Sequence, residues 1–380
     1  MRRVVLAAAA IVLLRGVASA DPPPDPDPPV EDAPVPPPWT DSATPAPNLT
    51  LGGDPATTPM GPTTDATLSP KYHPLRAELT VGTMYVAFAG WMYFAWYQHH
   101  ADIPYKFGGD DENCDPLHGG AKVRCVIFGW GGDTTYAGGE DKFGHAWSTM
   151  ALARLTDEIL EQWGGFNHQW SVALGTTLSW LTFVGVEVRD GFNFEFSFSD
   201  LGGDTVGALA GLVLMEFPRL DEMFDFRVQY FPSQMYIRKL DGASPCPFGG
   251  CSRWNIAEDY SGQTYLLAFH LSSIHALRDY PKYGFISRFI DIAAGFDTRN
   301  YKPTPDPSIG GRPTQEMFLG VSFNAQGLFD WLLEDSSHQT LRKVTHGLGE
   351  VFNLPFTSAG VFRYEHHPCP SCTPSNDGAL

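Results

Sequence analysis

One histidine and five carboxylates lie close together in the chain, among long apolar, glycine-containing stretches. They fall in the three segments DKFGH (Asp141, His145), EVRDG (Glu187, Asp190) and SDLGGD (Asp200, Asp204). Charged groups are costly to bury unless they are paired or bind a metal. These residues are therefore expected to form either a structural polar network or a functional site.

The first functional possibility is a metal site. The two residues of each segment are three or four positions apart, which brings both side chains onto one face of a helix. Each pair also lies near the end of an expected helix, so the three ends could converge. A histidine with carboxylates suits Mn, Fe or Zn, or with more oxygen ligands Mg or Ca. The candidate ligands of such a divalent metal ion are His145, Glu187, Asp190, Asp200 and Asp204.

The second possibility is catalysis without a metal. His145 could act as a general base that Asp141 or Glu187 orients, which makes these three the candidate catalytic residues. The chain has no GxSxG, HExxH or phosphate-binding glycine motif that would name a reaction. Whether the protein is an enzyme stays open at this point.

The third possibility is purely structural. Asp141 and Asp200 stand where helix N-caps are expected, a role that Ser199 could share, and acids there favour the positive end of a helix. The remaining charge could be neutralised by Lys142, Arg154 and Arg189. The sequence leaves all three possibilities open.

Four long, mostly apolar stretches are expected to be the helices that position these residues. Residues 79–97 carry no charge and end in aromatic residues, a length and composition that suit a helix spanning or dipping into a membrane. The others are residues 141–163, 170–188 and 200–215. The last of these has glycines at four-residue spacing, a small-residue face that should pack on a neighbouring helix; they are Gly203, Gly207 and Gly211.

The pattern changes after residue 223 to alternating apolar and polar residues, which indicates half-buried strands. Such runs occur at residues 224–230, 263–272, 286–297, 316–324 and 360–365. Five strands are too few to close a membrane barrel alone, so an antiparallel sheet packed on the helices is expected. The predicted fold class is α+β, a membrane-associated helical bundle of about four helices followed by an antiparallel β region.

The N-terminal part of the chain indicates export. Arg2 and Arg3, an apolar run and Ala18-Ser19-Ala20 predict a cleaved signal peptide over residues 1–20. Residues 21–70 are rich in proline and acids and contain no Lys or Arg, which predicts a disordered spacer. The net charge of −18 argues against nucleic acid as a partner.

The six cysteines form three local pairs, as expected for disulfides that close loops in an exported protein. The pairs are Cys114 and Cys125, Cys246 and Cys251, and Cys369 and Cys372. The last pair also reads as a CxxC redox motif, although it lies in a proline-containing tail without a strand-to-helix context. No cysteine follows Ala20 directly, so the sequence predicts no lipid attachment at the mature N-terminus.

The charged segments carry a family resemblance. The runs DKFGHAWSTMALARLTDEIL (141–160) and EVRDGFNFEFSFSDLGGDTVGALAG (187–211) resemble the YfiM-like family of predicted bacterial periplasmic lipoproteins, a domain of unknown function. A more distant likeness is to VanZ-like membrane proteins. The resemblance covers about residues 75–217 and implies an envelope location and a small, membrane-associated helical domain. It implies no catalytic residues.

Together these features predict five parts: a signal peptide (1–20), a spacer (21–70), a YfiM-like helical domain (71–217), a β-rich C-terminal region (218–368) and a tail (369–380). The expected protein is exported and lies on the periplasmic side of the cell envelope, in association with the outer membrane. Its expected role is structural or in interaction, with membrane or envelope components as partners and a protein partner possible through the C-terminal sheet. The alternative is a membrane-proximal hydrolase, metal-dependent or histidine-based, that acts on lipid or glycan.

Overall fold

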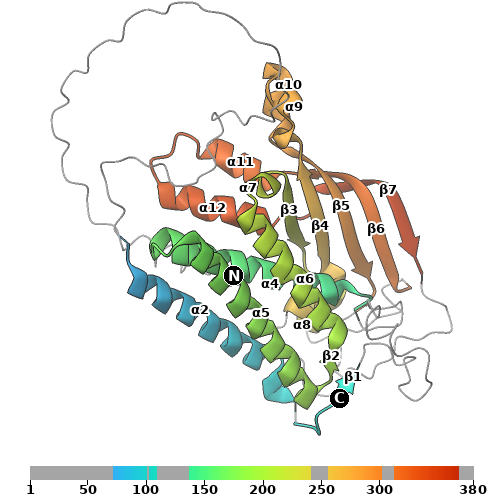
Figure 1. The fold of residues 1–380 in the computed structure, drawn as a ribbon. Coiled ribbons are helices and arrows are strands. Elements are labelled where there is room, and N and C mark those ends of the chain that lie inside the picture. The colour runs from blue at the N-terminus through green and yellow to red at the C-terminus, as the bar shows by residue number, and fades with distance from the viewer. Residues whose placement is uncertain (1–71, 101, 109–136, 241–255, 302–311, 368–380) are drawn as a thin grey trace, which may run out of the picture. The chain divides into compact units, whose positions relative to one another are not determined.

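The structure is a computed structural model that describes residues 72–100, 102–108, 137–240, 256–301 and 312–367. Within these residues the chain is α+β, with long helices first and an antiparallel five-stranded sheet after them (Figure 1). All of them belong to one compact unit, Thr67–Leu380. The predicted fold class is confirmed at this level. The predicted signal peptide, the spacer, the tail and all six cysteines lie outside the described residues. The predicted part boundaries stay predictions.

Four long helices form the first half of the unit. They are α2 (Pro74–Ala95), α4 (Glu140–Glu158), which continues into the π-helical turn η2 (Ile159–Trp163), α5 (His168–Asn193) and α6 (Phe198–Glu216). The three helices α4, α5 and α6 pack on one another, whereas α2 joins them mainly at η2. That contact buries Ala77, Val81, Ile159 and Leu160. The predicted membrane-associated bundle of about four helices is therefore not confirmed, because α2 packs chiefly against the end of α4.

Glycines let α6 approach α4 until their backbones are in contact. A Cβ atom at Gly207 would lie 2.0 Å from the carbonyl oxygen of Ala146, and one at Gly203 would lie 2.8 Å from that of Lys142. Any side chain at Gly207 would therefore force the helices apart. The small-residue face expected of residues 200–215 faces a neighbouring helix, and this close approach sets the height of the acidic residues of α6 against α4.

The sheet has the strand order β3 (Phe224–Tyr230), β4 (Gln263–His270), β5 (Ile290–Arg299), β6 (Thr314–Phe323) and β7 (Ser358–His366), with every neighbouring pair antiparallel. A register irregularity lies between Leu319 and Gly320, where β6 meets β7. Helices α11 (Ala325–Leu332) and α12 (Gln339–Val351) connect these two strands. Just after α12, the backbone N–H of Asn353 donates to the carbonyl of Val228 at 2.9 Å, which covers the outer edge of β3.

Shorter elements complete the described residues. They are η1 (Tyr97–His99), α7 (Pro218–Asp221), α8 (Gln234–Leu240), η3 (Ile256–Glu258), η4 (Tyr260–Gly262), η5 (Leu271–Ser273), α9 (His275–Arg278) and α10 (Pro281–Ser287). The two-residue strands β1 (Phe107–Gly108) and β2 (Phe196–Ser197) pair in parallel. This pairing holds the connection between α5 and α6, where two of the acidic segments meet.

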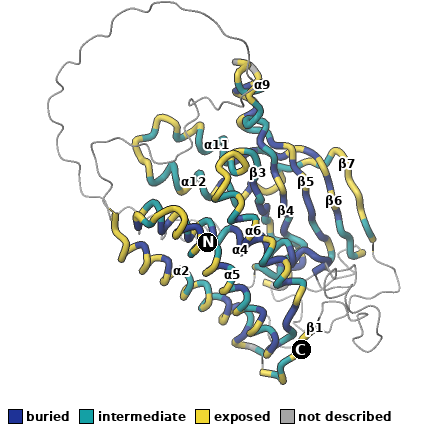
Figure 2. Tube along the Cα trace, viewed as in Figure 1, coloured by how far each residue is buried: buried dark blue, intermediate teal, exposed yellow. Residues whose placement is uncertain are grey.

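Helix α4 joins the helical half to the sheet. The ring of Phe143 stacks on Phe296 of β5 with 4.7 Å between centroids and lies 6.0 Å from the ring of Tyr265 of β4. Tyr265 and Phe296 are both buried. Figure 2 shows buried positions along the strands of the sheet in dark blue. The first turns of α4 thus lie between the sheet and the helices α5 and α6.

Candidate functional site

Three helix ends bring the predicted residues together. Asp141 and His145 lie in the first turns of α4, Glu187 and Asp190 near the end of α5, and Asp200 and Asp204 in the first turns of α6. Glu187 and Asp204 are 1 % and 0 % exposed, and the side chain of His145 is 20 % exposed. The convergence that the sequence could only raise as a possibility is present in the structure.

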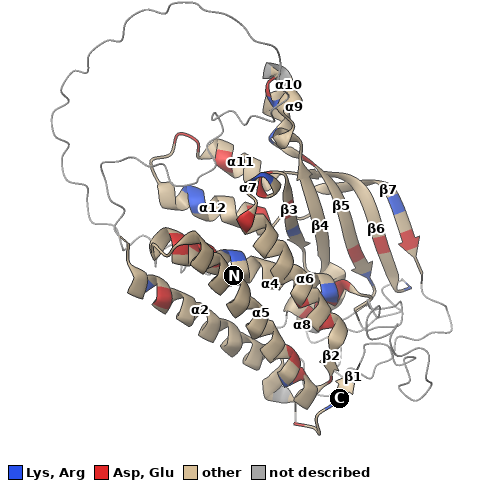
Figure 3. Ribbon diagram, in the orientation of Figure 1, with Lys and Arg blue, Asp and Glu red and all other residues tan. Residues whose placement is uncertain are grey.

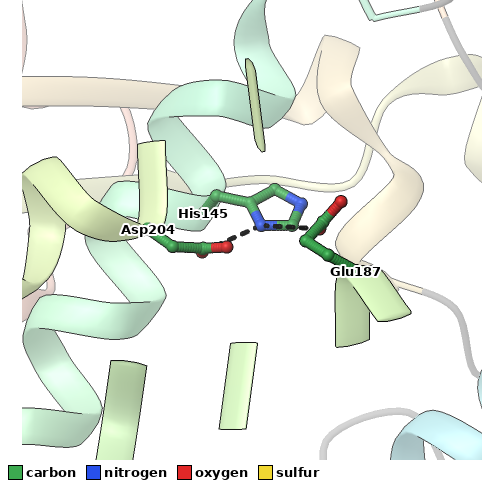
Figure 4. A group of neighbouring side chains, drawn as sticks. All are labelled: His145, Glu187 and Asp204. Atoms are coloured by element: carbon green, nitrogen blue, oxygen red, sulfur yellow. Dashed lines mark hydrogen bonds and ion pairs between the residues drawn. The ribbon is translucent and has the colours of Figure 1, made fainter. Parts of the chain in front are cut away.

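His145 lies between two carboxylates that approach the same ring nitrogen. Its Nδ1 is 3.0 Å from Oδ1 of Asp204 and 3.8 Å from Oε1 of Glu187 (Figure 4). The first distance is a hydrogen bond and the second is too long for one. The single N–H at Nδ1 can therefore donate to Asp204, and Oε1 of Glu187 receives no hydrogen bond from the imidazole.

Other groups hold the two carboxylates in place. The backbone N–H of Ser197 donates to Oε2 of Glu187 at 3.1 Å, and the hydroxyl of Thr149 lies 3.0 Å from Oδ1 of Asp204. Among the described residues, Oε1 of Glu187 and Oδ2 of Asp204 are buried and have no hydrogen-bond partner. Burying a carboxylate oxygen without a hydrogen-bond partner is unfavourable, because no hydrogen bond in the protein replaces those it makes to water.

Lys142 binds two of the three other acids of the group. Its Nζ is 2.8 Å from Oδ2 of Asp141 and 2.6 Å from Oδ1 of Asp200, and its side chain is fully buried. Asp141 is therefore held by Lys142, and no described contact joins it to His145. Asp200 lies near the imidazole, 3.9 Å from Nε2, beyond hydrogen-bond distance.

Two of the three expected neutralising cations lie elsewhere. Arg154 pairs with Asp221 and Glu350, each at 2.7 Å, and so links α4 to α7 and α12. Arg189 pairs with the exposed Asp102 at 2.7 Å. Of the three, Lys142 alone forms its described ion pairs with the acidic segments.

Asp190 is turned toward a different partner. Its Oδ1 accepts a hydrogen bond of 2.7 Å from the hydroxyl of Tyr97. Burial, followed by the charge of Asp190, raises the pKa of Tyr97, so the phenol keeps its proton and remains a donor. This places Asp190 beside the cluster, outside the group formed by His145, Glu187 and Asp204.

The helix caps differ from those expected. The N-cap of α6 is Ser197, whose Oγ accepts the backbone N–H of Asp200 at 3.1 Å, whereas Asp200 and Ser199 lie inside the helix. Gly139 precedes α4 without a side-chain cap. The prediction of Asp141, Asp200 and Ser199 as caps was therefore wrong, because α4 starts one residue and α6 two residues earlier than the apolar pattern indicates.

The carboxylates around His145 determine its protonation. Burial lowers its pKa, but Asp204, Asp200 and Glu187 more than offset this and hold the pKa well above its usual range. The imidazole therefore favours its charged form when it faces these acids alone. The surrounding carboxylates stabilise a positive charge at His145, which either a proton or a bound metal ion can supply.

A second buried polar network lies in the sheet, and the sequence interpretation missed it. Arg227 of β3 donates to Asp291 at 2.9 Å and also contacts Asp225. His270 lies 2.9 Å from Asp225 through Nε2 and 2.8 Å from Asp291 through Nδ1. The alternation in FDFRVQY indicated a half-buried strand, and its charged positions were the natural choice for a solvent-exposed face.

Comparison with known proteins identifies the segment that builds the first cluster. No curated protein and no solved structure matches the chain. The likeness to VanZ-like membrane proteins therefore stays a prediction. So does a catalytic role, for which the sequence suggests His145, Asp141 and Glu187. Residues 128–216 match the model of the family described as predicted periplasmic lipoprotein (DUF2279), and they contain His145 and all five acidic residues of the three helix-end segments. The family resemblance is thereby confirmed for this segment, and the description of the family supports an exported, periplasmic location in the cell envelope.

Proposed function

We propose that this envelope protein is seated in the outer membrane through the apolar face of its sheet, where it has a structural or interaction role. The residues that the structure describes offer their own apolar surface for a membrane. The sheet offers such a surface. The observation that carries the proposal is the distribution of polar and apolar residues over its two faces.

One face of the sheet is buried, and it encloses charged residues as well as the apolar cluster of Leu266, Ala293 and Phe318. Residues that pair across antiparallel strands share a face, which places His270, Asp291 and Ser322 together, each at most 5 % exposed. Arg227 and Glu316, at 0 % and 1 %, lie on the same face. Glu316 is 2.6 Å from Arg299 and 3.0 Å from Arg363. The carboxylate of Glu316 is thus enclosed and paired, although its two arginine partners are about half exposed.

The opposite face is apolar, and much of it is uncovered by the described residues. Leu267, Leu319 and Phe362 lie on neighbouring strands of this face, with Ala294 between the first two. The exposed apolar side chains of this face, 41 % to 71 % accessible, are Leu267, Ile292, Met317, Leu319, Val321 and Phe362. Strands with polar residues enclosed and apolar residues outward are typical of outer-membrane proteins. In water such a patch would be unfavourable.

The helices supply further apolar surface. Helices α5 and α6 are long and apolar enough to cross a membrane. Core helices of soluble proteins can have the same length and composition. Val206 and Leu209 of α6 and Val86 of α2 are more than half exposed. Figure 3 shows long uncharged stretches in these helices, with acidic groups toward their ends. These surfaces support lipid contact and do not by themselves require it.

The test is the binding of the purified mature chain to phospholipid vesicles, measured by flotation. Leu319→Arg should weaken binding, because a cation on a lipid-facing strand costs about 2–4 kcal/mol at the bilayer midplane and less near its surface. Leu332→Arg in α11 adds the same charge at a residue that is 59 % exposed and outside the sheet. It serves as the matched control.

The proposal predicts that the wild-type chain and Leu332→Arg float with the vesicles and that Leu319→Arg floats less. Failure of the wild-type chain to float, or equal flotation of both variants, would contradict it. Release of the native protein from cell envelopes by alkaline carbonate would also contradict a seat within the membrane.

A further inference from the structure

We propose that His145, Glu187 and Asp204 bind one divalent transition-metal ion, with Nδ1 of the imidazole and one oxygen of each carboxylate as ligands. This inference does not depend on the membrane proposal, since it rests only on the contacts among three residues that α4, α5 and α6 hold.

The spacing of the ligand atoms fits such an ion. One donor atom from each residue lies within 4.8 Å of the others, and Nδ1 is 3.0 Å from Asp204 and 3.8 Å from Glu187. Zinc binds nitrogen and oxygen at about 2.0–2.2 Å, so two ligands of one ion are separated by roughly 3 to 4 Å. Figure 4 shows both carboxylates directed toward the same side of the imidazole, where one ion could contact all three residues.

The hydrogen bonds within the group leave two carboxylate oxygens without a partner, and these oxygens could bind a metal ion. An imidazole has one N–H at Nδ1, so it cannot satisfy two carboxylates that both approach this nitrogen. Oε1 of Glu187 remains buried without a hydrogen-bond partner, and Oδ2 of Asp204 does too. A metal ion differs from a proton here because it can bind the nitrogen and both carboxylates at once.

The charge of the group is suited to a divalent cation. A metal-bound imidazole is neutral at the coordinating nitrogen, and carboxylates bind in their ionised form. Glu187 and Asp204 then contribute two negative charges that one divalent ion balances. The mixed nitrogen and oxygen ligands favour a first-row transition metal over calcium, which prefers oxygen alone.

Neighbouring groups would orient the ligands. The N–H of Ser197 holds the other oxygen of Glu187, and the hydroxyl of Thr149 lies against Asp204. Such contacts commonly fix the direction of metal ligands. Asp200 and Asp190, two of the five ligands that the sequence suggests, are bound by Lys142 and Tyr97. The site is thereby narrowed to three protein ligands.

A second group of similar composition provides an internal control. Asp157, Glu161 and His168 also bring donor atoms within 4.8 Å of one another. His168 is largely exposed and lies 2.7 Å from Glu161, so a simple surface ion pair accounts for that contact. We expect no stoichiometric metal binding there.

The experiment is a titration of the chelator-treated mature chain with Co²⁺, followed by visible absorption and by competition with Zn²⁺. Cobalt reports the ligand geometry through its absorption bands, which a purely structural polar network would not produce. The variants are Glu187→Gln, Asp204→Asn and, as the matched control, Glu161→Gln. Circular dichroism checks the fold of each.

The expected result is one bound cobalt per chain for the wild type and Glu161→Gln, displaced by zinc. Glu187→Gln and Asp204→Asn should each weaken binding by more than the roughly 10- to 100-fold that loss of an orienting partner costs. Absence of a stoichiometric cobalt spectrum in the wild type would overturn the proposal, whatever the variants do. So would unchanged affinity in a folded Glu187→Gln or Asp204→Asn, or its loss in Glu161→Gln alone.

Discussion

His145 and His270 each lie between two carboxylates, and the difference in their geometry gives them different roles. The two carboxylates of His270 approach different ring nitrogens, at 2.9 Å and 2.8 Å. A protonated imidazole donates one hydrogen bond to each, and the arrangement is complete. The carboxylates of His145 approach a single nitrogen, so one of them is left over. This is why we assign a structural role to His270 and a ligand-binding role to His145.

The pH dependence of stability should reveal the role of His270. Burial lowers its pKa, but hydrogen bonds and charges of Asp225 and Asp291 more than offset this and raise the pKa to about 9. A raised pKa contributes stability below the unfolded value of about 6.5 that is lost as the pH rises through about 9. The shift corresponds to on the order of 3 kcal/mol. In His270→Gln the free energy of unfolding should therefore lose this part of its alkaline dependence.

Denaturant unfolding of the wild type and His270→Gln at about pH 6 and about pH 9.5 measures this effect. The stability difference between the two should shrink toward alkaline pH. The pKa of Asp225 is lowered to about 2: burial raises it, but Arg227 and His270 more than offset this. That contribution is lost only as the pH falls from about 3.8 toward 2, so it leaves the alkaline comparison unaffected. A difference that stays constant with pH would show that His270 is not charged in the folded protein.

At the scale of elements, the glycine face of α6 sets the geometry of the site. Gly207→Ala should lower the free energy of unfolding by about 1–3 kcal/mol, because overpacking at a backbone contact forces the helices apart. The added Cβ would lie 2.0 Å from the Ala146 oxygen. Thermal or denaturant unfolding of the variant measures the cost.

Gly202→Ala, in the same helix, is the matched control. A Cβ there meets nothing within 4 Å, and alanine favours the helix by roughly up to 1 kcal/mol over glycine. It should be neutral or stabilising. Equal destabilisation by the two substitutions would show that the effect is one of helix propensity and that α6 does not pack closely on α4.

Much of this element-level organisation could be predicted from the sequence. Helical spacing and apolar runs located the long helices, and alternation located the five strands to within a few residues. The sequence could not fix the helix starts, because Ser197 and Gly139 lie outside the apolar pattern that marks the helices. The sequence also could not show that Glu187 belongs to the group around His145 and Asp190 does not. Only the fold brings Tyr97 to Asp190 and His145 to Glu187.

At the scale of the whole molecule, the least predictable feature was which face of the sheet is buried. A strand such as FDFRVQY indicates two faces and does not say which is enclosed. The usual expectation exposes charged residues and buries apolar ones. Here Asp225 and Arg227 are 1 % and 0 % exposed beside the apolar cluster of Leu266, Ala293 and Phe318, whereas Leu319 and Phe362 on the other face are 49 % and 71 % exposed. Arg227 can be buried because it donates hydrogen bonds to Asp291 of β5, to Asn324 and to Gln326 of α11. These partners come from distant parts of the chain, so the sequence of the strand alone does not reveal them.

The most direct test of a membrane seat is photocrosslinking in intact cell envelopes, with photoreactive p-benzoylphenylalanine in place of Phe362. Phe318, buried on the opposite face of the neighbouring strand, is the matched control position. A lipid-facing sheet predicts phospholipid or lipopolysaccharide adducts from position 362 and none from position 318. Adducts of position 362 with a protein alone, or no adduct with lipid, would contradict the account and identify this face as a protein-binding surface or a solvent-exposed one.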